Sequence, residues 1–233
     1  MKIDIARQPL VPAFMTLFAL AVAAMCAGIP VSDTSGAVRD ALPLLGGQLA
    51  RFQAAYPVWS KFAAGFMLLF TGMCAGRITI RYNLYTVGTC LPIPLYAIVA
   101  CGIATGGNYL AGFAASMLLA LATKNYCRAF CNGYGFDAIF RASLYLGLMP
   151  LVYAPGLPML LAVLLFRRTL REVAVATAGL LLPVFTACYV SWGTGAEFTA
   201  PLIKLGQSAI EGMPLHLFLD IPLPALVMAG GIV

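Results

Sequence analysis

The charged residues of this 233-residue chain stand between long apolar stretches, and this segregation limits the folds that the chain can adopt. Only 9% of the residues are charged, whereas a soluble globular domain has about 25%. The apolar stretches are about 20 residues long, which is the length of a helix that crosses a bilayer core. Because lipid offers the backbone no hydrogen bonds, helices are the expected structure. The sequence therefore predicts an all-α, polytopic transmembrane helical bundle.

The apolar stretches predict a single transmembrane domain, residues 1–233, with about 7–8 membrane segments of helical length. The first is longer than the roughly 7–15 apolar residues of a signal peptide, so we expect a retained helix. The last carries Asp220 and has no charged flank after it, which fits either a short final span or a truncated one. Besides residues 142–166, the expected spans are Pro9–Ile29, Pro57–Gly76, Leu84–Ala104, Tyr109–Ala122, Val173–Trp192 and Leu217–Val233.

Prolines interrupt the apolar stretch 142–166, and two arrangements fit it: one span, or a Pro-broken helical hairpin with its break near residues 153–156. Proline removes a backbone donor and clashes with the preceding turn, so a sharp break has a physical cause. With the hairpin, ten basic residues lie on the side of the N-terminus and four on the other. This asymmetry satisfies the positive-inside rule. We therefore favour the hairpin and predict a multi-pass bacterial inner-membrane protein with a cytoplasmic N-terminus.

The external loop, residues 30–61, contains one apolar stripe with helical spacing. Polar residues lie off the stripe, which is typical of a helix that lies at the membrane interface. A proline and a glycine pair are expected to weaken or kink this helix. The stripe consists of Val38, Leu42, Leu45, Leu49, Phe52 and Tyr56, and the interruptions are Pro43, Gly46 and Gly47.

The same loop holds the candidate catalytic residues, Asp33 and Asp40. If the protein is an enzyme, either carboxylate can serve as a general base beside a lipid phosphate. Arg39, Arg51 or Lys61 would then bind that phosphate. The simpler alternative is a helix-capping Asp33 and a solvated Asp40 that pairs with a neighbouring arginine.

Three further groups of charged residues lie on the predicted cytoplasmic side. Arg167, Arg168 and Arg171 form a cluster that is either a topology signal or a site for anionic lipid. Asp137 and Arg141 have the spacing of an ion pair on one helix face. The third group is Arg77 and Arg81, which are explained by arginine side chains that extend to the lipid head groups.

Several classes of site are excluded or disfavoured by composition. The single histidine, His216, has no companion at ligand spacing, so no metal site is expected. No cofactor motif is present. The basic residues flank apolar segments, where orientation signals lie, so no nucleic-acid partner is expected. No ionisable residue lies in the middle of a clear span, which disfavours a proton-coupled transporter.

The segment FRASLYLGLMPLVYAPGLPMLLAVLLFRRTLREVAVATAGLLLPVFTACY, Phe140–Tyr189, carries a resemblance. It resembles the broken hairpin, basic turn and Gly-Leu-Leu-x-Pro helix of GT-C-fold glycosyltransferases, which use polyprenyl-phosphate sugars. The resemblance implies a catalytic acid in the first external loop, either Asp33 or Asp40, although the paired acidic motif of many members is absent. Tyr109–Pro183 is also similar to an uncharacterised family of small bacterial polytopic membrane proteins. That family would be a reduced relative that keeps the GT-C scaffold.

Three functions fit these observations. The first is a non-catalytic membrane subunit or scaffold in cell-envelope assembly, with membrane lipids and other envelope membrane proteins as partners. In that case small residues such as Gly147, Gly156 and Gly179 are expected at helix contacts. The alternative is a GT-C-like glycosyltransferase that binds polyprenyl phosphate, and the third is a transporter or lipid flippase.

Overall fold

A computed structural model of the chain describes residues 10–26, 44–82, 90, 92–104, 108–131, 135–153, 160 and 169–212. Within these residues the structure is helical and contains no β-strand, which confirms the all-α prediction for the described part of the chain. The helices are α1 (Leu10–Cys26), α3 (Leu44–Ala55), α4 (Pro57–Arg81), α5 (Pro92–Ala104), α6 (Tyr109–Cys131), α7 (Phe136–Val152), α8 (Leu170–Gly193) and α9 (Ala200–Gly212).

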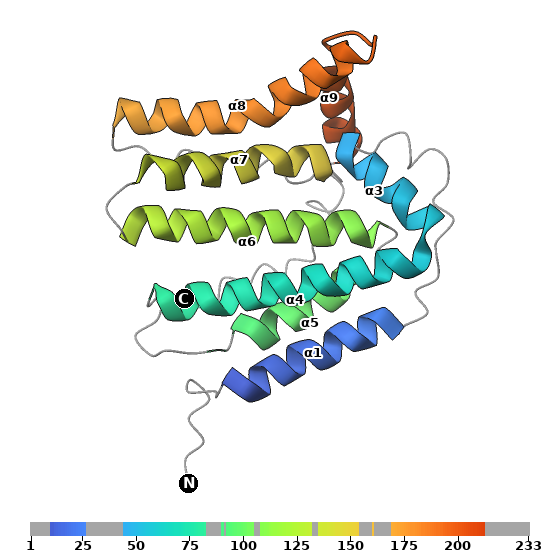
Figure 1. Cartoon of the computed structure of the whole chain (residues 1–233), viewed down its shortest axis with the longest axis vertical. Coiled ribbons are helices and arrows are strands. Elements are labelled where there is room, and N and C mark those ends of the chain that lie inside the picture. Colours follow the sequence, from blue (N-terminus) through green and yellow to red (C-terminus); the bar gives the residue numbers. More distant parts are fainter. Residues whose placement is uncertain are drawn as a thin grey trace, which may run out of the picture.

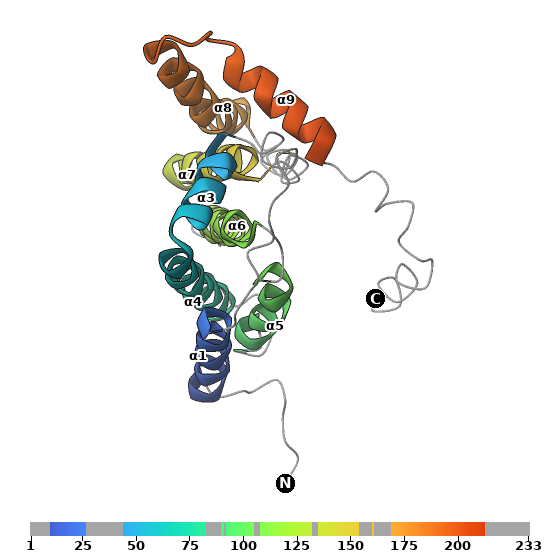
Figure 2. The same cartoon turned by 90° about the vertical axis from the view of Figure 1, so that its right-hand side faces the viewer.

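Five of the helices form a layer that is one helix thick. Helices α8, α7, α6, α4 and α1 lie side by side in this order, and Figure 2 shows the same column from the side. Helix α5 packs on α1 and α4 at one edge of the layer (Figure 1), and α9 packs on α8 at the other. Helix α3 crosses one end of the layer, where it contacts α4, α6 and α7. In Figure 2, α5 and α9 lie on one broad face of the layer, and no described helix of the chain covers the opposite face.

The direction of each helix follows from its contacts. Helices α7 and α8 run parallel, because Ser143 faces Gly179 while Gly147 lies against the backbone of Leu180. Helix α4 runs parallel to α6 and antiparallel to α1 and α5 (Figure 1). One end of the layer therefore holds the ends of α4 and α6 and the starts of α1, α5, α7 and α8.

Local sequence signals place several helix boundaries. Helix α4 starts with Pro57 at its first position, where proline's missing N–H costs no hydrogen bond. Helix α8 starts with a capping box, in which the Thr169 side chain accepts from the Glu172 N–H at 3.3 Å and the Glu172 carboxylate accepts from the Thr169 N–H at 3.2 Å. Helix α7 ends at Val152, one residue before the predicted break.

Other boundaries differ from the sequence prediction. The predicted fourth helix stops at Ala122, whereas α6 continues through Lys124 and Arg128 to Cys131. Basic residues near a helix C-terminus interact favourably with the helix dipole, so the polar composition of this segment does not end the helix. Helix α5, Pro92–Ala104, covers the second part of the predicted third helix, whose residues 84–89 lie outside the described residues.

Helix α3 exposes part of the stripe that was predicted to be its apolar face. Leu45 and Phe52 are exposed, whereas Gly46 and Gln53 are buried against the rest of the protein. The prediction was wrong about Gln53, because its side chain has a specific acceptor role at the start of α6. Its Oε1 accepts a hydrogen bond from the backbone N–H of Leu110 at 3.4 Å, and this N–H has no partner within its own helix.

Two described helices, α4 and α8, are long and apolar enough to cross a membrane by length and composition. Helix α1 adds a shorter apolar stretch, Val11–Ala23. The predicted final segment, residues 217–233, lies outside the described residues, as does the second half of the predicted hairpin apart from Leu160.

Candidate functional site

Charged side chains of the layer lie only near its two ends. The end where α7 and α8 begin is called the basic end here, and its described charged residues are Arg77, Arg81, Lys124, Arg128, Asp137, Arg141, Arg171 and Glu172. The opposite end carries Arg51, Lys61, Glu197 and Lys204. Between these groups, the described parts of α4, α6, α7 and α8 contain no charged residue. The uncharged part of α8, residues 173–193, is about 30 Å long at the helical rise of about 1.5 Å per residue.

On α1, α4 and α8, the helix faces are the inverse of those in a water-soluble protein. Helix α4 buries small and hydroxylated residues, and it exposes bulky apolar ones. Phe66, near its middle, is 66% exposed, whereas Gly65 beside it is buried. The buried face carries Ser60, Ala64, Gly65, Leu68, Thr71, Gly72, Gly76, Ile78 and Thr79, and the exposed face carries Trp59, Phe62, Phe66, Phe70 and Met73. Helix α8 follows the same rule, with Ala176 and Gly179 inside and Phe185 and Trp192 outside.

Glycines bring α7 and α8 into backbone contact. A Cβ atom at Gly147 would collide with the backbone of Leu180, and one at Gly179 would lie 2.7 Å from the carbonyl oxygen of Phe140. The predicted role of both glycines at helix contacts is confirmed, while Gly156 lies outside the described residues. This interface therefore depends on the absence of side chains at these two positions.

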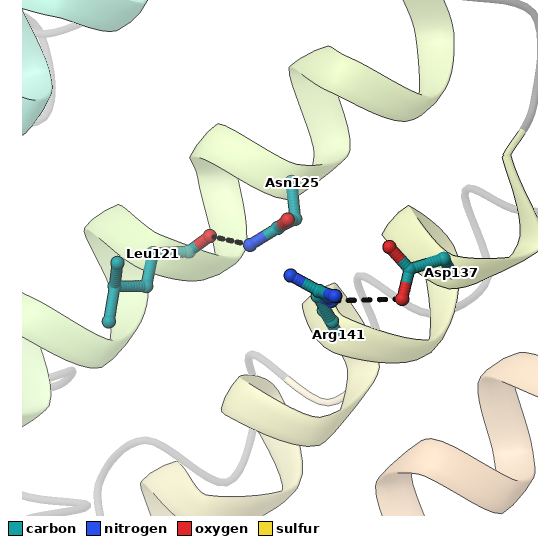
Figure 3. A network of polar contacts seen from close by, with 4 residues as sticks. All are labelled: Leu121, Asn125, Asp137 and Arg141. Carbon is teal, nitrogen blue, oxygen red and sulfur yellow. Dashed lines mark hydrogen bonds and ion pairs between the residues drawn. The ribbon is translucent and has the colours of Figure 1, made fainter.

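Both described acidic residues at the basic end already have local partners. Asp137 Oδ1 accepts from Arg141 Nε at 2.9 Å, which confirms the predicted ion pair (Figure 3). Glu172 belongs to the capping box of α8. Asn125, a buried residue near this pair in Figure 3, donates to the Leu121 carbonyl oxygen at 2.8 Å within its own helix. The remaining basic side chains of this end therefore outnumber the carboxylates that are free to pair among the described residues.

A cavity of about 610 Å³ opens at the basic end between α1, α4, α5 and α6. Its walls are mainly apolar and include Val11 and Phe14 of α1, Phe70 and Met73 of α4, and Ile93 of α5. Close contacts hold this part of the layer together, because Cβ atoms at Gly72 and Gly76 would lie 2.7 and 2.5 Å from Leu17 and Ile93. The volume is within the range of about 300–1,000 Å³ that is typical of small-molecule sites.

Three basic residues, Arg77, Arg81 and Lys124, line the same cavity, and its described lining contains no acidic residue. The Cys74 thiol, which also lines the cavity, lies within electrostatic reach of both Lys124 and Arg77. The two arginines are one turn apart on α4, where like charges repel each other. The site therefore combines apolar walls with an excess of positive charge.

A second cavity, of about 510 Å³, lies between α3, α7 and α8 toward the opposite end of the layer. Its described lining is rich in leucine, and its only polar side chains are hydroxyls of threonine and serine. The Thr186 and Thr194 hydroxyls donate to backbone carbonyls of their own segment. This cavity therefore offers a ligand little beyond apolar contact.

The structure separates the predicted site residues that it describes. Arg51 and Lys61 lie on α3 and α4 at the opposite end, whereas Arg171 lies at the start of α8 at the basic end. Arg51 and Arg171 are exposed, and Lys61 is half-buried. The other predicted residues, Asp33, Arg39, Asp40, Arg167 and Arg168, lie outside the described residues.

The basic cavity was not predicted from the sequence. Extension to the head groups was sufficient to explain Arg77 and Arg81, and Lys124 was expected in an interfacial segment rather than on a helix. The signal that points to the cavity is the distance of each basic residue from the start of its helix. Arg77 lies 20 residues after the start of α4, and Lys124 lies 15 residues after the start of α6. The two helices run parallel, and the Ser60–Tyr109 hydrogen bond of 2.5 Å joins their starts. Both basic residues therefore come to the same end of the layer.

Among the described residues, no group of three histidine, cysteine or acidic side chains could hold a metal ion. Comparison of the chain with protein-family models, curated proteins and solved structures finds no match.

Proposed function

We propose that the chain is a polytopic bacterial inner-membrane protein and serves as a non-catalytic subunit or scaffold in cell-envelope assembly. The observation that carries this proposal is the inversion of the faces of α1, α4 and α8, with small residues inside and bulky apolar residues outside. In water, exposed apolar patches larger than a few hundred Å² are uncommon on monomers. In lipid, small residues let helix backbones approach closely, and bulky apolar residues face the acyl chains.

The distribution of charge supports an orientation of the protein in the proposed membrane. The uncharged middle of α8 matches the roughly 30 Å hydrocarbon core of a bilayer. The basic end carries six described basic residues, Arg77, Arg81, Lys124, Arg128, Arg141 and Arg171, against three at the opposite end. The positive-inside rule therefore assigns the basic end to the cytoplasm.

The parallel course of α7 and α8 supports a return through the membrane between them. If both helices span, the chain must come back to the basic end between Tyr153 and Thr169. Residues 154–168 would reach about 22 Å as a helix, the conformation that lipid requires, at about 1.5 Å per residue. This is close to the length of α7, about 25 Å for its 17 residues. A hairpin over residues 142–166 meets this requirement.

The open layer supports a role as a subunit. A layer that is one helix thick exposes much of its surface, among the described residues, to lipids or to neighbouring proteins. Helix α4 presents an exposed aromatic row, with Trp59, Phe62 and Phe66 all more than half exposed. Aromatic residues are enriched at protein interfaces, so this row is a suitable contact for another membrane subunit.

Replacing the candidate catalytic acids is expected to leave the protein functional. We expect Asp33→Asn and Asp40→Asn, singly and together, to complement a deletion strain fully, because a scaffold needs no general base. The measurement is the growth and envelope integrity of the complemented strain, with protein abundance checked by immunoblotting. Loss of complementation at unchanged abundance would instead support the glycosyltransferase alternative, because a catalytic base cannot be replaced by an amide.

The complementation result is informative only beside a variant that is expected to fail in the same assay. The triple variant Phe62→Leu, Phe66→Leu and Phe70→Leu keeps the α4 face compatible with lipid but removes its aromatic shape. If this face contacts a partner subunit, the variant reaches the membrane but fails to form the native complex in mild detergent. Complementation and complex size equal to wild type would contradict a partner on this face.

A further inference from the structure

We infer that the cavity at the basic end binds an anionic glycerophospholipid, with its phosphate at Arg77, Arg81 and Lys124 and one acyl chain along α1 and α4. This inference rests on the proposed membrane location and adds a ligand to it. The juxtaposition that carries it is a set of three cations at one end of an apolar cavity of about 610 Å³.

The charge of the site selects an anion. Arg77 and Arg81 are exposed and Lys124 is half-buried, and all three line one cavity whose described lining has no carboxylate. The two nearby described acids are engaged elsewhere, Asp137 with Arg141 and Glu172 with the start of α8. A phosphate diester at the cavity would relieve the repulsion between the basic residues and accept charge-assisted hydrogen bonds from them.

The shape of the site selects a lipid. Along α4 the lining extends from Arg81 back to Phe70, which is about 16 Å at the helical rise of about 1.5 Å per residue. One leaflet is about half of the roughly 30 Å hydrocarbon core, so this length matches a single acyl chain. On α4, Phe70 and Met73 lie closer to the middle of the layer than Arg77 and Arg81, so apolar contact extends inward from the cations, as it does for a phospholipid in its leaflet.

The cavities at the two ends of the layer differ in the charge of their lining residues. The leucine-rich cavity between α3, α7 and α8 has apolar walls without any charged lining residue among those described. It therefore serves as an internal comparison, because it can take an acyl chain but cannot select a charged head group.

The test compares lipid retention by variants of the full chain. The purified protein is exchanged into detergent micelles that contain phosphatidylglycerol and phosphatidylcholine with identical acyl chains, and bound lipid is counted by native mass spectrometry. We expect about tenfold preferential retention of phosphatidylglycerol, because the three basic residues attract an anionic head group more strongly than a zwitterionic one. The double variant Arg77→Gln and Lys124→Gln is expected to lose this preference.

The matched control is Arg128→Gln with Arg171→Gln, which removes the same charge from the same end but outside the cavity lining. It should retain the preference. A second variant, Met73→Trp, narrows the apolar part of the cavity while it keeps all three cations, and it should lose bound lipid of either class from this site. Equal retention of the two lipids by wild type, or equal loss in both double variants, would overturn the inference.

Competition with two other phosphate compounds tests whether the ligand is a glycerophospholipid. If polyprenyl phosphate displaces phosphatidylglycerol at a lower concentration, or if inorganic phosphate displaces it equally well, the phospholipid assignment is wrong. Alkaline carbonate extraction of the membranes is carried out for every variant. Wild-type protein in the soluble fraction would contradict the proposed function itself, whereas membrane-bound protein without lipid preference would contradict only this inference.

Discussion

Replacing Gly147 by valine should force α7 and α8 apart and destabilise the protein more than any other single change at their interface. The added side chain would collide with the backbone of Leu180, which cannot rotate away as a side chain can. Over-packing lowers the stability by about 1–3 kcal/mol or more. We expect the upper end of this range, because the obstacle at Gly147 is main chain. At about 2–4 °C per kcal/mol for a chain of this size, the melting temperature should fall by roughly 10 °C.

The measurement is thermal unfolding in mild detergent of a protein whose other cysteines are replaced by serine, followed with a thiol-reactive fluorophore that reports exposure of the buried Cys188 on α8. Gly206→Val on α9 is the matched control, because a Cβ at Gly206 meets no atom within 4 Å. An unchanged melting temperature for Gly147→Val, or an equal loss for Gly206→Val, would contradict the observed packing of α7 on α8.

Placing a charge at Phe66 should prevent insertion of α4 into the membrane. An aspartate near the centre of a spanning helix costs about 2.5–3.5 kcal/mol on insertion scales, which corresponds to roughly 100-fold in the insertion equilibrium. Phe66 is near the middle of α4 and 66% exposed, so the new carboxylate would face lipid with no partner from the layer. The expected result for Phe66→Asp is loss of the protein from the membrane fraction.

Phe66→Leu is the control, because it alters the shape of the same position but keeps it apolar, and it should insert normally. The outcome for a water-soluble protein is opposite in sign. There, aspartate in place of an exposed phenylalanine would shrink an apolar patch and raise the soluble yield. A higher soluble yield for Phe66→Asp would therefore contradict the assignment of α4 as a spanning helix.

The sequence predicts the helices well where a local rule acts. Pro57 starts α4 and Tyr109 starts α6, as predicted, and Gly147 and Gly179 lie at the contact between α7 and α8. These features depend on residues that are close in sequence or on the size of a single side chain. A proline or a glycine constrains the backbone in the same way in any fold, so no tertiary information is needed.

The sequence fails where the decisive partner is distant. The burial of Gln53 depends on the backbone N–H of Leu110, which is 57 positions away. Likewise, the basic cavity requires that α4 and α6 run parallel, so that Lys124 comes to the same end as Arg77 and Arg81. No periodicity within one segment reports such a juxtaposition. The continuation of α6 through Lys124 is missed for a different reason, because polar composition favours a helix end there while the helix dipole favours continuation.

The most direct test of the proposal that the layer spans a membrane is the accessibility of single cysteines at its two ends in spheroplasts. Cys131 at the end of α6 and an introduced Glu197→Cys after α8 are both exposed positions, and each is studied with the other native cysteines replaced by serine. We predict that a membrane-impermeant maleimide labels the cysteine at position 197 in intact spheroplasts and labels Cys131 only after lysis. Equal labelling of both before lysis, or labelling of Cys131 alone, would contradict a membrane-spanning layer whose basic end lies in the cytoplasm.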